Sequence, residues 1–322
     1  MSGPEPVRVT TGRLLQVYAA APLLAGLLVV AWVAVPAVAA VDPARLAFAY
    51  SLVFGMPHIV GSLFALADPA LRRPIQAWWG PAAAAVTLVV LAASAVLERR
   101  LLEQIVIVAT MVHVLGQQSG LAAGQARLPR DGTGAWLTRA WRWLLAIACT
   151  LASLAIGGEA LRPVLEQPLP WLQAAGGLLG LTTPLAAGLA YFAWRHGGDV
   201  RAMLATHGLA VAGFLCASAG LPLLGVGMIR WTHDATAFAA YGALASARYR
   251  ADPAANWLYR PWRWMGLREI GWTLWPMAIV AALLLSLLLP EPLSLALIFI
   301  HYAFEHRLWR RDSPWRAWVR LG

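Results

Sequence analysis

The stretch that decides the fold is Leu293–Trp309, LSLALIFIHYAFEHRLW, an apolar run that carries His301, Glu305 and His306. A run this apolar predicts a membrane-spanning helix. Ionisable groups in hydrocarbon are costly, so they usually face the interior of a helix bundle and mark a functional site. His301 and Glu305 are four residues apart, which places them on one helix face and makes half of a transition-metal site. The alternative is that Glu305 and His306 lie at the membrane edge, beside Arg307.

Composition places the whole chain in the membrane class. Of its 322 residues, 60% are hydrophobic and 12% are charged, whereas soluble domains carry about a quarter charged residues. A helical crossing needs about 20 apolar residues, and such runs recur along the whole length. The two cysteines, Cys149 and Cys216, both fall inside apolar runs and support neither a disulfide framework nor a zinc motif.

The pattern predicts an all-α, polytopic bundle that forms a single membrane domain over 1–322. We expect about ten spans, with eight as the lower bound, and the eighth is the least hydrophobic. The predicted spans are residues 15–41, 45–67, 78–97, 101–123, 141–158, 171–194, 202–220, 226–247, 270–289 and 292–310.

The basic residues orient this bundle. With a cytoplasmic N-terminus, 20 arginines fall in inside segments and five in outside segments, as the positive-inside rule requires. We therefore expect both termini in the cytoplasm and a multi-pass protein of a bacterial-type inner membrane. Segment 248–269 interleaves Arg and Trp between two spans, which favours an amphipathic stretch on anionic lipid over a nucleic-acid contact.

Histidines recur inside the predicted spans at a similar depth. His58, His113 and His301 lie roughly 9 to 12 residues before the cytoplasmic ends of their spans, a common level within about one turn. His233 lies about five residues nearer the outside by the same count. Each histidine alone is compatible with a hydrogen-bonded core residue, but four near one layer favour a shared site.

Imidazoles with a carboxylate suit iron and related transition metals. The predicted metal ligands are His58, His113, His233, His301 and Glu305. We expect Asp234 to be a further ligand or to orient a ring nitrogen, and Gln117 and Tyr241 to position dioxygen or substrate. The chain contains no CxxC, P-loop, dinucleotide-binding, GxSxG or HExxH pattern.

Four short motifs over residues 55–306 carry a family resemblance. Gly55-Met56-Pro57-His58 resembles the Gly-x-Pro-His motif of the Brp/Blh-type bacterial β-carotene dioxygenases, and the later histidines follow in similar order. The resemblance implies a membrane-bound iron that cleaves a polyene with dioxygen. At residues 59–62 the chain has Ile-Val-Gly-Ser, where the family motif continues with Gly and a downstream Asp. PHxxxS, HxxxQxxG and the ending are also similar to uncharacterised bacterial membrane proteins with histidine motifs.

The sequence thus predicts an integral membrane oxidoreductase with non-haem iron or another transition metal: an oxygenase, hydroxylase or desaturase. Its expected partners are membrane lipids, a lipid-soluble substrate and an electron-donor protein, with no nucleic acid. Two alternatives stay open. One is a b-type haem protein that exchanges electrons with quinone, and the other is a proton-coupled transporter that relays protons through these side chains.

Overall fold

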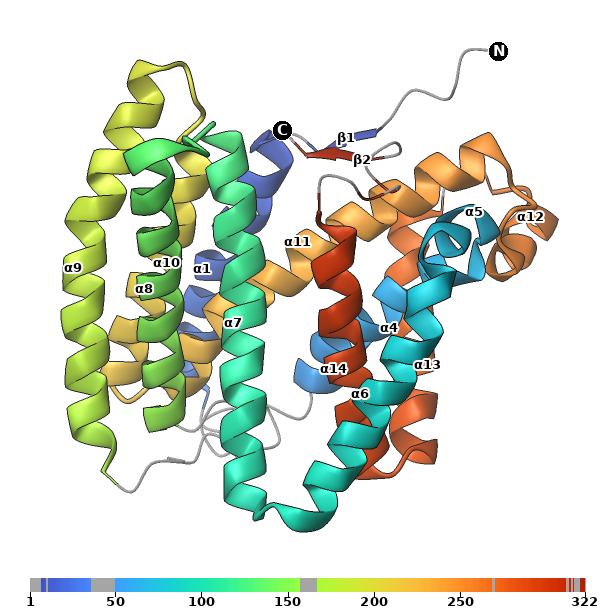
Figure 1. Cartoon of the computed structure of the whole chain (residues 1–322), viewed down its shortest axis with the longest axis horizontal. Coiled ribbons are helices and arrows are strands. Elements are labelled where there is room, and N and C mark those ends of the chain that lie inside the picture. Colours follow the sequence, from blue (N-terminus) through green and yellow to red (C-terminus); the bar gives the residue numbers. More distant parts are fainter. Residues whose placement is uncertain are drawn as a thin grey trace. The chain divides into compact units, whose positions relative to one another are not determined.

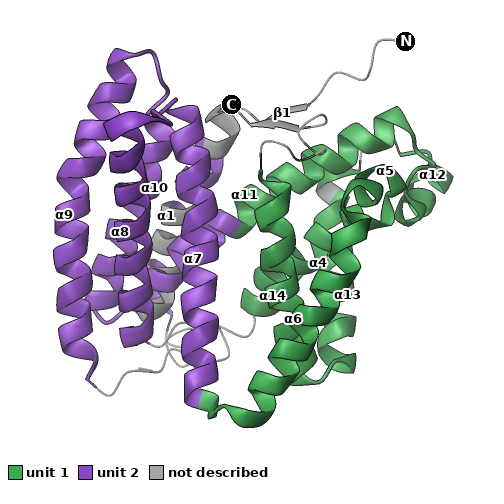
Figure 2. Ribbon diagram, viewed as in Figure 1, with its two compact units in different colours: residues 1–9, 50–99, 234–320 green, residues 10–49, 100–233, 321–322 purple. Residues whose placement is uncertain are grey.

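The computed structural model describes residues 7–9, 11–35, 50–156, 167–267, 270–310, 313, 315 and 319–321. The chain divides into two compact units (Figure 2). Unit 1 comprises Met1–Val9, Tyr50–Arg99 and Asp234–Arg320, and unit 2 comprises Thr10–Ala49, Arg100–His233 and Leu321–Gly322. The prediction of a single membrane domain stays a prediction.

Unit 1 is built from helices of very different length (Figure 1). They are a π-helical turn Ser51–Gly55, α4 Met56–Phe64, a 3-10 turn Ala65–Ala67, α5 Pro69–Arg72, a 3-10 turn Arg73–Ile75, α6 Gln76–Val96, the second part of α11 Pro222–Ala251, a 3-10 turn Trp257–Tyr259, α12 Arg260–Trp264, a 3-10 turn Gly271–Thr273, α13 Leu274–Leu288 and α14 Glu291–Leu308. Helix α14 packs against α6 and α4, and α13 packs against α4. Strands β1 Val7–Val9 and β2 Val319–Leu321 pair in a two-stranded sheet.

Unit 2 is a bundle of long helices. They are α1 Thr11–Ala34, α7 Arg99–Gln125, α8 Gly132–Ile156, α9 Pro168–Arg195, α10 Arg201–Ser218 and the first part of α11. Helix α8 packs along α9, and α10 contacts α1, α8 and α9. A Cβ on Gly213 of α10 would stand 2.7 Å from the carbonyl oxygen of Gly225 on α11. Glycine therefore permits a backbone contact of the kind that small residues allow in membrane helices.

Each of the ten predicted spans overlaps a helix over most of its described length. The described span-end residues that lie in turns, bends or loops are Val35, Leu97, Ala219, Gly220, Ile270, Leu289, Trp309 and Arg310. Among the described residues, five helices are long and apolar enough to cross a membrane, namely Pro69–Val96, Arg99–Gln125, Gly132–Ile156, Pro168–Arg195 and Arg201–Ser218. Ser51–Ala67 and Leu274–Leu288 are shorter apolar helices. The chain is therefore an all-α protein suited to a multi-pass membrane location, while ten crossings and cytoplasmic termini stay predictions. Parts of the predicted first, second and fifth spans, at 36–41, 45–49 and 157–158, lie outside the described residues.

The Gly-Met-Pro-His motif explains the entry into α4. Pro57 has no N–H to give to the carbonyl four residues earlier, that of Val53. This carbonyl accepts a hydrogen bond from the indole Nε1 of Trp275 on α13, at 2.8 Å. The π-helical turn before Pro57 is the kind of helix irregularity that often accompanies functional sites. The proline thus exposes an acceptor that fastens α13 to α4 one turn before His58.

One face of α4 is shaped for close packing by a glycine. A Cβ at Gly61 would lie 3.2 Å from Phe238 Cε1 and 3.8 Å from Ala278 Cβ. Phe238 of α11 and Ala278 of α13 therefore both pack against the face of α4 that follows His58. This packing fixes α4, which carries the first histidine of the candidate site, against two other helices of unit 1.

Candidate metal centre

Two histidines from distant parts of the sequence meet inside unit 1. The Nε2 atoms of His58 on α4 and His301 on α14 are 3.0 Å apart. The two rings stand nearly perpendicular, at 82°, with their centroids 4.6 Å apart. Both side chains are buried. The depth estimate from the sequence placed these two histidines at one level, and they are neighbours in the structure.

Glu305 completes a group of three donors in unit 1. Its carboxylate oxygens lie 3.7 Å from His58 Nε2 and 3.6 Å from His301 Nε2. Ligand atoms about 2.1 Å from one ion, at angles of about 90–110°, are about 3.0–3.4 Å apart. The three donors are therefore spaced nearly as ligands of a transition-metal ion would be. Glu305 has an exposed fraction of 0%, whereas His306 is exposed, so Glu305 faces the interior of unit 1 and His306 does not. The depth of either residue in a membrane stays a prediction.

Ser62 orients His301 within this group. Its hydroxyl donates to the carbonyl oxygen of Ile59 at 2.7 Å, as a serine one turn along a helix often does. Ser62 Oγ lies 2.8 Å from His301 Nδ1. Because the serine proton points to Ile59, we assign the proton between Ser62 and His301 to Nδ1. The Nε2 of a neutral His301 then carries a lone pair that faces His58 and Glu305, the form that metal ligands use.

Tyr241 and Asp234, both predicted to act in catalysis, lie in unit 1. The ring centroid of Tyr241 is 5.9 Å from that of His58, and its buried hydroxyl makes no hydrogen bond within the described part of the chain. Asp234 is buried and accepts a hydrogen bond from the Tyr50 hydroxyl. Tyr241 is thus a neighbour of the His58–His301–Glu305 group, whereas Asp234 is hydrogen-bonded to Tyr50.

The other two predicted histidine ligands are neighbours in unit 2. The ring centroids of His113 on α7 and His233 on α11 are 5.2 Å apart, with an interplanar angle of 79°. His233 is buried and His113 is half-buried. Gln117 lies one turn after His113 on α7 and is half-buried. His233 is the last residue of the unit 2 segment Arg100–His233, and the continuous helix α11 carries on into unit 1.

The described residues contain one group of side chains that could hold a metal ion: His58, His113, His233 and Glu305. Each offers one ligand atom, a ring nitrogen or a carboxylate oxygen. These four are among the five ligands predicted from the sequence, and the fifth, His301, is the partner of His58 and Glu305 in unit 1. That any of them binds a metal stays a prediction, as do the catalytic roles of Gln117, Asp234 and Tyr241.

The other histidines serve elsewhere. His207 on α10 lies 3.1 Å from Thr183 Oγ1 on α9, and His196 is exposed at the end of α9, with Nδ1 2.8 Å from the Phe192 carbonyl oxygen. Ser62 was not assigned a role from the sequence. Its position four residues after His58 was the available indication, because that spacing puts both side chains on one helix face.

Comparison with known proteins gives no match to a protein-family model, to a curated protein or to a solved structure. The class of the protein is therefore defined by its own fold and side chains. It is a helical protein whose described part contains five helices fit to cross a membrane and a buried His/Glu group that could bind a metal ion.

Proposed function

We propose that the chain is an integral membrane oxidoreductase whose His/Glu group holds a non-haem metal ion, with iron as the preferred metal. The observation that carries this proposal is the group of two imidazoles and one carboxylate in unit 1, His58, His301 and Glu305. Two histidines with one carboxylate on one side of an ion form the facial ligand set of non-haem iron oxygenases, which leaves positions open for dioxygen. His113 and His233 are the further imidazole ligands that we propose for the same ion.

The surrounding residues support this role. Ser62 would hold the proton on His301 Nδ1, so that Nε2 keeps its lone pair for the ion. Tyr241 would offer its hydroxyl as a hydrogen-bond donor to a molecule bound beside His58. Burial of His58, His301 and Glu305 excludes bulk water, which strengthens the interaction of the ion with its ligands. A bound iron would supply the activation of dioxygen.

The proposed substrate is lipid-soluble, because a buried site in a membrane bundle is most easily reached from the bilayer. The similarity of Gly55-Met56-Pro57-His58 to the Brp/Blh-type motif makes an isoprenoid or polyene chain one candidate. The reaction would then be an oxygenation, hydroxylation or desaturation, and the latter two need electrons from a donor protein. The proposed location is a bacterial-type inner membrane.

The geometry argues against His58 and His301 as the two axial ligands of a haem. Ring nitrogens bind transition metals at about 2 Å, so ligands on opposite faces of a haem stand about 4 Å apart. The 3.0 Å between the two Nε2 atoms is too short for an iron between them. A proton-coupled transporter remains the alternative, since a His/Glu group within a membrane bundle could also relay protons.

Elemental analysis of the detergent-purified protein, together with its optical spectrum, tests the proposal. We expect bound iron or another transition metal without a Soret band. His58→Gln and His301→Gln should lose the metal while folded protein still accumulates in the membrane, because glutamine offers no ring nitrogen lone pair. His207→Gln and His196→Gln are the matched controls and should retain it.

Three results would contradict the proposal. Equal metal content in all four variants, measured per folded protein, would leave the site without support. A Soret band would favour the haem alternative. Ion flux into proteoliposomes by a metal-free protein would favour the transporter.

A further inference from the structure

One end of unit 1 exposes large apolar side chains between α11 and the apolar helix α13. The segment Asn256–Leu267 joins α11 to the 3-10 turn that leads into α13, and it contains α12 (Figure 1). Its side chains of Trp257, Trp264 and Met265 have exposed fractions of 61%, 79% and 61%. Such side chains are rarely left so exposed to water in a folded protein.

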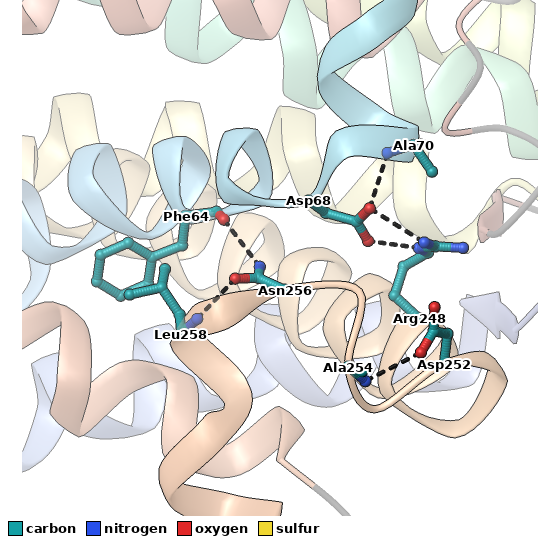
Figure 3. Close-up of polar contacts among 8 residues, drawn as sticks. All are labelled: Phe64, Asp68, Ala70, Arg248, Asp252, Ala254, Asn256 and Leu258. Atoms are coloured by element: carbon teal, nitrogen blue, oxygen red, sulfur yellow. Dashed lines mark hydrogen bonds and ion pairs between the residues drawn. The ribbon is translucent and has the colours of Figure 1, made fainter.

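The segment is nevertheless firmly anchored on its inner side. Asn256 accepts a hydrogen bond from the Leu258 backbone at 2.9 Å and donates to the Phe64 carbonyl oxygen at 3.2 Å (Figure 3). Tyr259 and Trp262 are buried in a cluster with Tyr249 and Ile270. The exposed side chains therefore project from a fixed support.

An ion pair fastens the neighbouring helix α5 to α11. Arg248 donates to both oxygens of Asp68, at 2.6 and 3.0 Å, and Asp68 Oδ1 also accepts the Ala70 N–H at 2.9 Å (Figure 3). Both side chains of the pair are buried. Since Asn256 bonds to Phe64, four residues before Asp68, the segment Asn256–Leu267 and α5 are fastened to one support.

Exposed positive charge surrounds the apolar side chains. Arg260 and Arg263 lie on α12, and Arg72 and Arg73 lie at the end of α5 and the start of the following turn. Within the described part of the chain, these four guanidinium groups make no ion pair. The one exposed acid of the neighbouring turn, Asp252, accepts the Ala254 N–H at 3.0 Å.

We propose that this face of unit 1 binds the headgroups of anionic phospholipids, with the tips of Trp257, Trp264 and Met265 inserted among the first acyl carbons. Tryptophan side chains favour the headgroup level of a bilayer, and arginines beside them attract anionic lipid. We call this face the interfacial platform, comprising Asn256–Leu267 with Arg72 and Arg73. It is independent of the metal site and of the reaction.

An acidic soluble protein is the other class of partner that a basic face could fit. The bilayer is favoured because the platform precedes, through the 3-10 turn Gly271–Thr273, the apolar helix α13. Its apolar tips also alternate with arginines, as in helices that lie in the interface plane.

Depth measurement by spin labelling tests the insertion. A nitroxide would be placed at Trp264→Cys in the full-length protein with Cys149→Ala and Cys216→Ala, reconstituted in vesicles of phosphatidylcholine and phosphatidylglycerol. We expect its relaxation to respond more to oxygen, which dissolves in lipid, than to a water-soluble nickel chelate. Ala254→Cys, on the exposed polar turn before the platform, is the matched control and should respond more to nickel. Equal nickel accessibility at both positions would overturn the proposal and favour a soluble partner.

The charge requirement is tested by lipid selectivity. Spin-labelled phosphatidylglycerol and phosphatidylcholine compete for the protein, and the ratio of their association constants is measured. Arg260→Gln with Arg263→Gln should lower the preference for phosphatidylglycerol by about fivefold or more, the effect of losing one to two arginine–lipid contacts. Arg99→Gln with Arg100→Gln, at the start of α7, removes equal charge and should change this preference little. Equal effects of the two double variants, or no effect of either, would contradict headgroup binding at the platform.

Discussion

At the scale of single residues, Glu305 is the most informative side chain in the molecule. A carboxylate with no exposed surface in an apolar helix loses on the order of several kcal/mol of hydration free energy, unless its surroundings replace the lost water contacts. His58 and His301 lie within 3.7 Å of its oxygens and are the groups of unit 1 that can do so, either directly or through an ion. A cation held by all three would satisfy the carboxylate and both ring nitrogens together.

Ser62 gives the sharpest prediction at this scale. Ser62→Ala removes the acceptor of the His301 Nδ1 proton, so the ring can adopt the other tautomer and offer a protonated Nε2 to the metal. We expect metal affinity, measured by chelator competition, to fall by about 10- to 100-fold, the usual effect of losing such a partner. Ser62→Thr keeps the hydroxyl and should restore most of the affinity.

The control for this prediction is a serine in another part of the structure. Ser153→Ala removes a buried hydroxyl from α8 of unit 2 and should leave metal affinity unchanged. If the Ser62→Ala and Ser153→Ala proteins bind metal equally well, Ser62 has only a packing role. Cobalt substitution adds a second measurement, because the d–d bands of Co²⁺ would change on loss of the hydroxyl only if His301 is a ligand.

At the scale of elements, the junction of α4 with α13 can be tested by a double-mutant cycle. Trp275→Phe removes the indole donor to the Val53 carbonyl and should cost about 1 kcal/mol of stability, a typical net value for one hydrogen bond. In a Pro57→Ala background, residue 57 gains an N–H that can reach the same carbonyl. The cost of Trp275→Phe should then be smaller, and the difference between the two costs is the coupling energy. Additive effects on the unfolding free energy would mean that Pro57 does not create the acceptor that Trp275 uses.

Tyr259, which is buried beneath the interfacial platform, should make the stability of the protein depend on pH in the alkaline range. Burial, followed by the nearby Asp68 carboxylate, raises the pKa of Tyr259 from 10.0 to about 12, against smaller opposing effects of Asn256 and Arg248. Because the folded pKa lies above the unfolded value, the stabilisation is complete below pH 10 and is lost as the pH rises to 12. Its full size is up to about 3 kcal/mol. Tyr259→Phe should make the thermal midpoint fall less steeply between pH 10 and 12, and an unchanged slope would contradict this.

Element positions were largely predictable from the sequence, whereas their connections were not. Long apolar runs predicted a helix at each of the ten segments, because a chain in lipid must satisfy its backbone groups internally. The π-helical turn Ser51–Gly55 was not predicted, since its partner Trp275 lies more than 200 residues away along the chain. The buried pair Asp68–Arg248 was missed for the same reason: hydropathy assigns both residues to span ends and gives no information on which ends meet.

At the scale of the whole molecule, the sequence predicted which side chains meet in the candidate site better than it predicted how their rings are oriented. Counting residues from span ends placed His58 and His301 at one level, and the i, i+4 spacing joined Glu305 to His301. Which ring nitrogen faces the donors depends on Ser62 and Ile59, and this required the three-dimensional contact. The count also gave His233 a different depth from His113, yet the two rings are neighbours in unit 2. Helix ends in the 226–247 region carry no clear boundary residues, so the depth scale is least accurate there.

The arrangement of the chain across the membrane gives the last prediction. It rests on the arginine distribution, with 20 residues on the predicted inside and five on the outside, because positive charge near span ends is retained in the cytoplasm. Reporter domains fused after Gln125 and after Gly322 should therefore report the cytoplasm, and a fusion after Arg162, outside the described residues, should report the opposite side. A fusion after Pro290, between α13 and α14, is the matched control at the C-terminal end and should agree with Arg162. A cytoplasmic result at Arg162 would contradict the ten-span arrangement, because an odd number of crossings would then be missing or added before that point. If the missing or added crossing lies between the spans of His58 and His113, these two spans would run in opposite directions and the residue count would no longer place the two histidines level.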